Sequence, residues 1–558
     1  MEKQGGYEMK LVKNLILGSA AGVLAVSGAQ AADLPVKAKA VEYVRICSTY
    51  GAGFFYVPGT DTCIKLGGFL RVDTTLNGSL YDQVSWSGDL GQGNRYRDYF
   101  SARSRMGLSV DTRTATEYGI VRTFGQGNFT FTTQGNNTVN PATYTGSPST
   151  GTATALLNNP GEGYVTVDLT FLQFAGFTFG KSASAYSTPW HGYPGNQTSF
   201  LLGGHDTITG TNNIQYTAQF ANGVSGTIGL DDPVVTNRTA IYNTSYAVNS
   251  FANGGNAYGG VHAPDIVGNI RVSQDWGMFQ ISAAAHEVDA SYNFLNGILP
   301  APGTVGIAAA SPTASSEIGG HPDTKWGGSV MAALQISNIP TGAGDVFRID
   351  GSYAVGDTKN VISTSAASPN FTMFSGSGRL GAYQSLGFGA TTDAVYLPGL
   401  SSGPFSGTGG QGDLKLTTSY GFRTAFTHNW DPRWATSLFG AVAAVRYGGA
   451  AVGFGGAFDP TTAKGQLCQA FVGSTGGYAT KSADFRCNPD FTTYQIGSTT
   501  YWTPVPNLTF TAEVQYFYLA QNFAGTSVLP PTAPKPTAVY EFKNQSTVSF
   551  MARAQRNF

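Results

Sequence analysis

Charged residues are scarce in this sequence. Lys, Arg, Asp and Glu make up 12 % of the 558 residues, about half of the roughly 25 % found in an average soluble protein. The net charge of −1 disfavours nucleic-acid binding, which needs a concentrated positive face. The sequence also has a low mean hydropathy of −0.09. This value disfavours a bundle of membrane helices, since each such helix needs about 20 apolar residues.

Glycine and aromatic residues are abundant instead. Glycine accounts for 74 residues, nearly twice the usual share of roughly 7 %. Aromatic residues reach 13 %, mostly Phe and Tyr, and so many of them disfavour disorder because they seek burial. These features indicate a β protein with an unusually uncharged exterior.

The amino terminus has the pattern of a secretory signal peptide. A short basic stretch at 9–13 precedes an uncharged, Leu-, Ala- and Gly-rich stretch at 14–32. The small residues Ala29 and Ala31 predict cleavage between Ala31 and Ala32, so that 1–31 is removed, with 1–8 an upstream extension. The alternative is a membrane anchor, but glycines interrupt the apolar stretch and no basic stop follows. We therefore expect export, with 32–62 as the mature N-terminal segment.

Four cysteines fit an oxidising compartment. Cys47 and Cys63 are 16 positions apart, and Cys468 and Cys487 are 19 apart. Three pairings are available, and pairing between neighbours is the simplest. The alternative is metal binding, but neither pair has the two-to-four-residue spacing typical of zinc sites. The sequence therefore predicts two structural disulfides.

Period-two alternation recurs in hairpins. The run at 214–220 alternates apolar and polar residues, Asn222-Gly223 follows as a strong turn signal, and alternation resumes at Val224. Long stretches rich in Gly, Ser, Thr, Asn and Pro lie between such hairpins, at 131–162, 233–264, 289–323, 358–412 and 448–489. Short turns that alternate with long loops predict a transmembrane antiparallel β-barrel over 63–558, with periplasmic turns and extracellular loops.

The two faces of these strands favour lipid outside and water inside. One face carries Phe, Ile, Leu, Val and Tyr, whereas the other carries uncharged polar residues and isolated arginines. Trp276, Trp430 and Trp502 lie at or beside the proposed turns, where an interfacial aromatic girdle is expected. Only a closed sheet leaves no backbone group unpaired in hydrocarbon.

The final strand alternates and ends on an aromatic residue. Phe550 belongs to its apolar set, and the sequence stops at Phe558. This ending resembles the signal by which outer-membrane barrels are recognised for insertion. We therefore predict that Phe550 and Phe558 act in assembly, with the barrel-assembly machinery as partner.

Several blocks resemble the alphaproteobacterial general porins. They are 32–38, the block from Cys47 to Arg71, 103–105, 111–122 and 171–181. The resemblance implies a 16-stranded barrel in the outer membrane, usually a homotrimer, in contact with lipid and lipopolysaccharide. It also implies passive diffusion of small hydrophilic solutes and ions. Alternatives are a substrate-selective channel, for example for sugars, and a surface adhesin or other binding barrel.

Counted with this expectation, the chain accommodates sixteen strands. The third is ambiguous, because Tyr118, Ile120 and Arg122 share one parity, which a bulge would resolve. The strands are expected to begin near Ile64, Tyr96, Glu117, Gly163, Phe177, Asn213, Val224, Asp265, Met278, Thr324, Val346, Asp413, Trp434, Asp490, Leu508 and Phe542.

Strand parity turns several basic residues inward and predicts a pore constriction. Lys65, Arg71, Arg103, Arg105 and Arg122 form a basic wall on the first three strands. The alternative is that these arginines only pair with acidic neighbours such as Asp73. The resemblance implies that the third outer loop, 185–212, folds into the lumen opposite this wall, with Asp206 as its only carboxylate.

Catalytic patterns are weak. The glycines at 376–381 match G-x-G-x-x-G, but they lie in a Gly/Ser-rich loop without a βαβ unit. His286-Glu287 lacks the second histidine of a zinc protease. We expect neither an enzyme nor a cofactor or metal.

Overall fold

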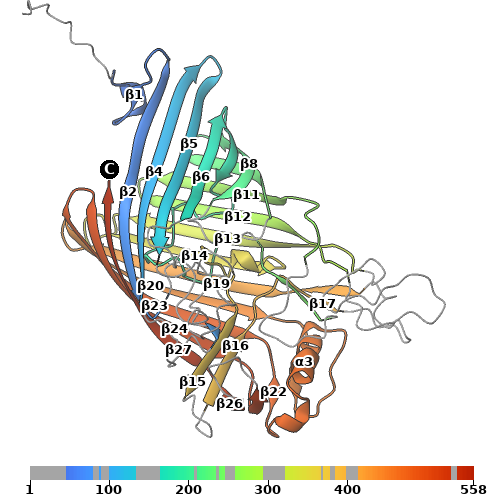
Figure 1. Ribbon diagram of the computed structural model, residues 1–558. Coiled ribbons are helices and arrows are strands. Elements are labelled where there is room, and N and C mark those ends of the chain that lie inside the picture. Colours follow the sequence, from blue (N-terminus) through green and yellow to red (C-terminus); the bar gives the residue numbers. More distant parts are fainter. Residues whose placement is uncertain are drawn as a thin grey trace, which may run out of the picture.

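The computed structural model describes residues 45–78, 87–88, 100–132, 164–205, 210–233, 238–244, 258–292, 321–365, 368–376, 384–397, 412–529 and 537–558. Within these ranges, sixteen long antiparallel strands form one closed barrel (Figure 1), which confirms the predicted fold. The barrel closes where β2 (Thr62–Leu76) pairs with both β4 (Phe100–Thr116) and β27 (Gln545–Asn557). Ala31, Ala32 and the rest of the predicted signal peptide lie outside the described residues.

Each barrel strand pairs with its neighbours along the chain. Among the described residues, no helix is long and apolar enough to cross a membrane. The other barrel strands are β5 (Gly119–Thr132), β6 (Tyr164–Phe174), β7 (Phe177–Ser182), β8 (Thr211–Gln219), β9 (Val224–Asp231), β11 (Asp265–Gln274), β12 (Gly277–Val288), β13 (Lys325–Ser337), β14 (Val346–Val355), β19 (Thr418–Asn429), β20 (Trp434–Arg446), β23 (Phe491–Val505) and β24 (Leu508–Gln521).

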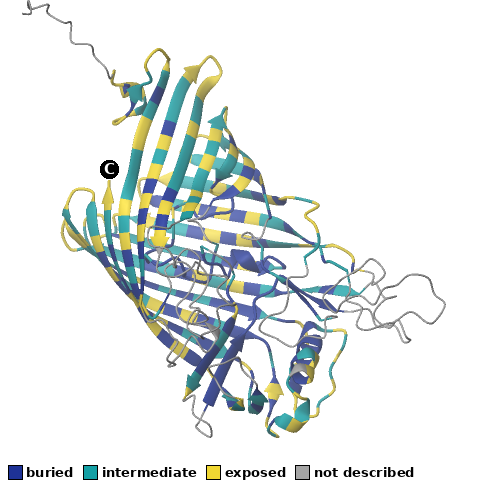
Figure 2. Ribbon diagram, in the orientation of Figure 1, coloured by how far each residue is buried: buried dark blue, intermediate teal, exposed yellow. Residues whose placement is uncertain are grey.

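The strands bury one face and expose the other, and Figure 2 shows this as alternating dark and yellow bands. On β2, Leu66, Leu70 and Val72 are exposed, whereas Asp73 and Thr75 are buried. The same apolar-out pattern continues around the barrel, for example at Val514 and Phe550. An apolar band of this kind suits hydrocarbon, and closure satisfies the backbone within it.

Short turns join successive strands at the rim where the carboxyl terminus lies (Figure 1). Asn222 and Gly223 both have positive φ, at 62° and 71°, and Phe220 N donates to Val224 O over 2.8 Å. Asn-Gly tolerates this geometry, which matches the twist of the flanking strands. The hairpin predicted at this position is confirmed.

Two predicted strand starts are wrong. Asp413–Leu416 forms β18, which pairs with β17 (Ala394–Leu397) outside the barrel, and the barrel strand begins at Thr418. Phe542 ends β26 (Ala538–Phe542), which pairs with β25 (Thr526–Leu529). Alternation cannot separate a loop strand from a barrel strand that follows it closely, because their partners come from distant segments.

Most other predicted starts agree with the structure. Those that fall on described residues lie within two residues of the observed ones, while Tyr96 and Gly163 lie outside the described residues. The third strand contains no bulge near Arg122, because Ile120 and Arg122 both face inward in continuous register with β4. The register shift lies where β5 pairs with β6, and it leaves Asp168 as the extra residue on β6.

Strands and helices in the loops build a cap at the rim opposite the short turns (Figure 1). Its hydrophobic core joins Phe371, Leu386 and Phe471 to Phe491 and Phe517 on the inner face of β23 and β24. The cap is therefore packed into the barrel along one side. Its remaining elements are β3 (Ser87–Gly88), β10 (Ile241–Asn243), β15 (Phe371–Gly376), β16 (Gln384–Gly389), β21 (Val452–Gly453), β22 (Arg486–Cys487), α3 (Ala463–Ser474), η5 (Thr358–Asn360) and η6 (Tyr478–Thr480).

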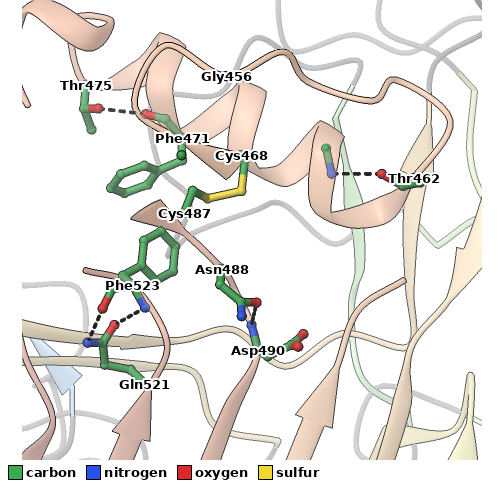
Figure 3. The surroundings of a disulfide bond; sticks show 12 residues. Gly456, Thr462, Cys468, Phe471, Thr475, Cys487, Asn488, Asp490, Gln521 and Phe523 are labelled. Atoms are coloured by element: carbon green, nitrogen blue, oxygen red, sulfur yellow. Dashed lines mark hydrogen bonds between the residues drawn. A yellow bond between two sulfur atoms is a disulfide. The ribbon is translucent and has the colours of Figure 1, made fainter. Parts of the chain in front are cut away.

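Both predicted disulfides are present. Cys468 on α3 bonds to Cys487 on β22, beside the packed rings of Phe471 and Phe523 (Figure 3). Cys47 bonds to Cys63 at the start of β2, and so ties β1 (Phe55–Tyr56) and η1 (Ser48–Tyr50) to the short-turn end of the barrel. One bond therefore staples a loop and the other staples the segment that precedes the barrel.

Candidate functional site

The seam where the barrel closes carries a buried charge network. Asp73 on β2 accepts from Arg103 Nε on β4 over 2.8 Å and from Arg553 Nε on β27 over 2.5 Å. Asp73 is fully buried, and both arginines are nearly so. Hydrogen bonds between the charged groups offset the free-energy cost of removing them from water. Because two guanidinium groups share one carboxylate, the network keeps a net positive charge.

The four predicted arginines all face the interior, but they have different partners. Arg103 pairs with Asp73, as the alternative interpretation of the basic wall expected. Arg122 donates to Asp111 through Nε and Nη2 over 3.0 Å each. Asp206 lies outside the described residues.

The other two predicted arginines donate to neutral side chains. Arg71 Nε contacts Gln555 Oε1 at 2.7 Å, and Arg105 Nε contacts Thr130 Oγ1 at 3.2 Å. Lys65 lies on the same face of β2 as Arg71 and is exposed. The basic residues of β2, β4 and β5 thus share one face without forming a single cluster.

Residues 183–205, which follow β7, run along the inner wall of the barrel. Inward-facing side chains of β11, β12, β14 and β23 donate to backbone carbonyls of this segment, which is almost entirely buried. The donors are Asn269 to Ala185, Gln280 to Ser187, Arg348 to Pro194 and Tyr501 to Gly195, over 2.6 to 3.1 Å.

The middle of this segment contacts β24 and the charge network at the seam. Buried Glu513 accepts from Gln197 N over 2.5 Å and from Thr198 N over 3.3 Å. Arg553 Nη1 donates to Gln197 Oε1 over 2.5 Å. The segment therefore reaches Arg553, whose guanidinium also holds Asp73.

The segment returns along β19 and β20 through two glycines. A Cβ on Gly203, whose φ is +114°, would lie 2.7 Å from the carbonyl oxygens of Phe422 and Val442. A Cβ on Gly204 would lie 2.4 Å from Asp350 Oδ1. Only glycine permits this close approach.

Residues 183–205 contain no Asp, Glu, Lys or Arg. Burial lowers the pKa of His205 to about 4, so this histidine is neutral at pH 7. The segment thus lines the interior with neutral polar and aromatic groups. The charged residues around it lie on the barrel strands and, in the case of Lys359, on η5.

Sequence reasoning missed four charged residues in this region. Arg553, Glu513 and the buried Arg423–Asp350 pair were not among the predicted site residues. Each is a single charge on the polar face of an alternating strand. Strand parity was therefore the signal that could have found them.

The comparisons with known proteins agree with this architecture. The family model described as porin subfamily matches residues 33–551. Porin Omp2b of Brucella suis biovar 1 (strain 1330) is 30 % identical over 272 residues, which are 48 % of this chain and 63 % of that protein. Porin Omp2b of Brucella abortus (strain 2308) gives the same values, so the match leaves more than a third of each relative uncovered.

A solved structure shares the fold. The outer membrane channel DcaP of Acinetobacter baumannii superposes with a TM-score of 0.51, at 11 % identity, over 90 % of this chain and 99 % of that one. Since the family model matches most of the chain and the barrel has an apolar outer face, the protein belongs to the porin subfamily and resides in the outer membrane.

Proposed function

We propose that the chain forms a water-filled channel for passive diffusion of small hydrophilic solutes and ions, and is not an enzyme. The observation that carries this proposal is the polar inner face, along which the 183–205 segment covers the β11–β24 side. The β2, β4 and β5 side carries the predicted inward arginines. The space between the segment and these arginines is the proposed constriction, formed by Arg71, Arg103, Arg105, Arg122 and Asp206.

The family resemblance supports a homotrimer in contact with lipid and lipopolysaccharide, inserted by the barrel-assembly machinery. We further propose that 1–31 is a signal peptide cleaved between Ala31 and Ala32, and that 32–62 precedes a barrel domain at 63–558. N-terminal sequencing of the outer-membrane protein tests the cleavage. Crosslinking in outer-membrane vesicles tests the trimer.

Planar-bilayer recording of the purified protein tests the channel. Stable, stepwise conductance in KCl that scales with salt concentration is expected. Proteoliposomes should swell with small sugars and stop swelling as the sugars grow. Absence of conductance from folded protein would contradict the proposal, and conductance limited to one sugar would favour a substrate-selective channel.

A further inference from the structure

Three inward-facing arginines are held by glutamines of the adjacent strand instead of by carboxylates. Arg71 Nε donates to Gln555 Oε1 over 2.7 Å, Arg271 Nε to Gln280 Oε1 over 2.8 Å, and Arg348 Nε to Gln335 Oε1 over 2.7 Å. None of the three has an ion pair within the described ranges. A glutamine oxygen orients a guanidinium without neutralising it, so each arginine keeps its charge.

The glutamines beside Arg271 and Arg348 are themselves fixed. Gln280 Nε2 donates to Ser187 O over 2.6 Å and to Ser282 Oγ over 2.7 Å. Gln335 Nε2 donates to Ser337 Oγ over 3.2 Å. Their amide nitrogens are thereby occupied, which turns their oxygens toward the two arginines.

The outer nitrogens of both guanidinium groups remain available. Among the described residues, neither Nη of Arg271 has a hydrogen-bond partner, and Arg348 uses only Nη1, which donates to Pro194 O over 3.1 Å. Both side chains are partly exposed. A guanidinium with free Nη groups binds carboxylate or phosphate oxygens in a fork.

Arg271 and Arg348 lean toward each other across one wall. Arg271 on β11 reaches toward β12, and Arg348 on β14 reaches toward β13. Their backbones are three strand spacings apart and offset by two residues along the strands, because the row of Arg271 meets Asp350 on β14. At about 4.8 Å per strand and about 3.4 Å per residue this separation is roughly 16 Å, and the leaning side chains shorten the gap. Arg271 lies three residues before the end of β11, and Arg348 lies two residues after the start of β14, so both lie near the short-turn rim.

The surroundings favour an anion between them. The inward-facing acids that the structure describes on these four strands already have partners, because Asp350 pairs with Arg423 and Asp265 with His286. The uncharged 183–205 segment forms a third side, with the Trp190 ring centre 6.0 Å from Arg348 Cζ. The unbonded Nη groups of Arg271 and Nη2 of Arg348, beside a neutral wall, suit a small solute that carries two negative charges.

We propose that Arg271 and Arg348 form a binding site for small dianions, with carboxylate or phosphate groups, on the lumen wall of β11–β14. This site rests on the proposed channel function and assigns that channel a substrate class. Anions entering it exchange water for guanidinium forks that are already oriented. The site raises the local concentration of such anions and slows the passage of chloride when they are present.

The test is block of single-channel KCl current by succinate and, separately, by inorganic phosphate. Both are expected to reduce the current in a concentration-dependent way, and acetate much less. Block by succinate alone assigns the site to dicarboxylates, and block by phosphate alone assigns it to phosphorylated solutes. Absence of block by either, in a channel that conducts normally, overturns the site and leaves the channel function intact.

Gln280→Glu and Gln335→Glu sharpen the test, because each places a carboxylate against an arginine that stays in position. Combining them should weaken block about tenfold or more, because each new carboxylate takes the charge-assisted hydrogen bonds that the anion would otherwise receive. Gln126→Glu is the matched control. Gln126 faces inward on β5, away from the β11–β14 wall, and has no hydrogen bond to an arginine among the described residues.

Equal weakening by Gln126→Glu would reduce the effect to a general charge in the lumen and would overturn the site. The double variant Arg271→Lys/Arg348→Lys keeps both charges and removes the forks. It is expected to lose block while keeping the anion preference of the open channel. Retained block in this variant also contradicts the proposal. Circular dichroism and the gel shift on heating establish that each variant is folded.

Discussion

Arginines point inward both at the seam of β2, β4 and β27 and on the wall of β11–β14. The two regions differ in whether a carboxylate neutralises the charge of the guanidinium groups. At the seam, Arg103 and Arg553 share buried Asp73. On the wall, Arg271 and Arg348 lean on neutral glutamines and stay partly exposed. At the seam a carboxylate compensates two guanidinium groups that are shut away from water, whereas on the wall, where the guanidinium groups meet water, a neutral acceptor orients each of them. Arginine therefore stabilises the closed barrel at the seam, whereas on the wall its positive charge stays accessible to solutes in the lumen.

The largest expected effect comes from breaking the seam. Asp73→Asn leaves two buried cations without their carboxylate and should cost about 3–5 kcal/mol of unfolding free energy. Gln335→Leu, on the wall, removes a hydrogen bond from a partly exposed arginine and should cost about 1 kcal/mol. Denaturant unfolding in detergent measures both. Equal costs would show that the two regions do not differ in this way.

Neutralising Arg103 and Arg105 together should shift the pore toward cations. At about 10 Å, a unit charge contributes roughly 1.7 kcal/mol at an effective dielectric of about 20, and only about 0.4 in bulk water. Asp206→Asn should shift selectivity toward anions. Reversal potentials in a KCl gradient measure both shifts, and if neither potential moves, the constriction lies elsewhere.

A pH effect is expected where the wall meets the cap. Asp357, just after β14, accepts from Ser329 Oγ over 2.6 Å and from Asn360 Nδ2 over 2.7 Å. Burial raises the pKa of Asp357 to about 7, opposed by His286 and reinforced by Asp265 and Asp393. Because the folded state holds this proton above the ordinary pKa of about 3.9, the stability it contributes is complete below about pH 4 and is lost as the pH rises to about 7.

Hydrogen exchange of residues 358–363 measures this effect. After correction for the intrinsic rate, wild-type exchange should accelerate between pH 4 and 7. Asp357→Asn preserves the side-chain shape and removes this titration, so its corrected exchange should accelerate less than that of the wild type. The remaining acceleration comes from Asp393, which accepts from Thr358 N and whose pKa is raised by burial to about 6. The same acceleration in the variant would assign it to another group.

The smallest expected change in conduction follows deletion of Phe558. Its backbone N donates to Gly68 O over 3.0 Å and its O accepts from Gly68 N over 3.1 Å, which adds the last pair of bonds to the seam. Its side chain is exposed on the outside. Deletion should lower the amount of folded protein in the outer membrane and leave single-channel conductance unchanged. Normal membrane levels would contradict an assembly role.

Much of the barrel was predictable because period-two alternation is local. A strand that faces lipid on one side and water on the other must alternate, and turns such as Asn222-Gly223 punctuate it within a few residues. The inward direction of Arg71, Arg103, Arg105 and Arg122 follows from the same parity. The strand starts at Asp413 and Phe542 were wrong because cap strands also alternate.

The sequence by itself determined the class of fold, the inward face of the strands and the local pairing of the cysteines, since each depends on neighbours in the chain. The number of sixteen strands came from the family resemblance. Only the tertiary structure decided which arginine meets a carboxylate and which meets a glutamine. Arg103 and Arg553 are 450 residues apart in sequence, yet barrel closure places both beside Asp73. Strand register decides such pairings, and register is set by the whole closed sheet.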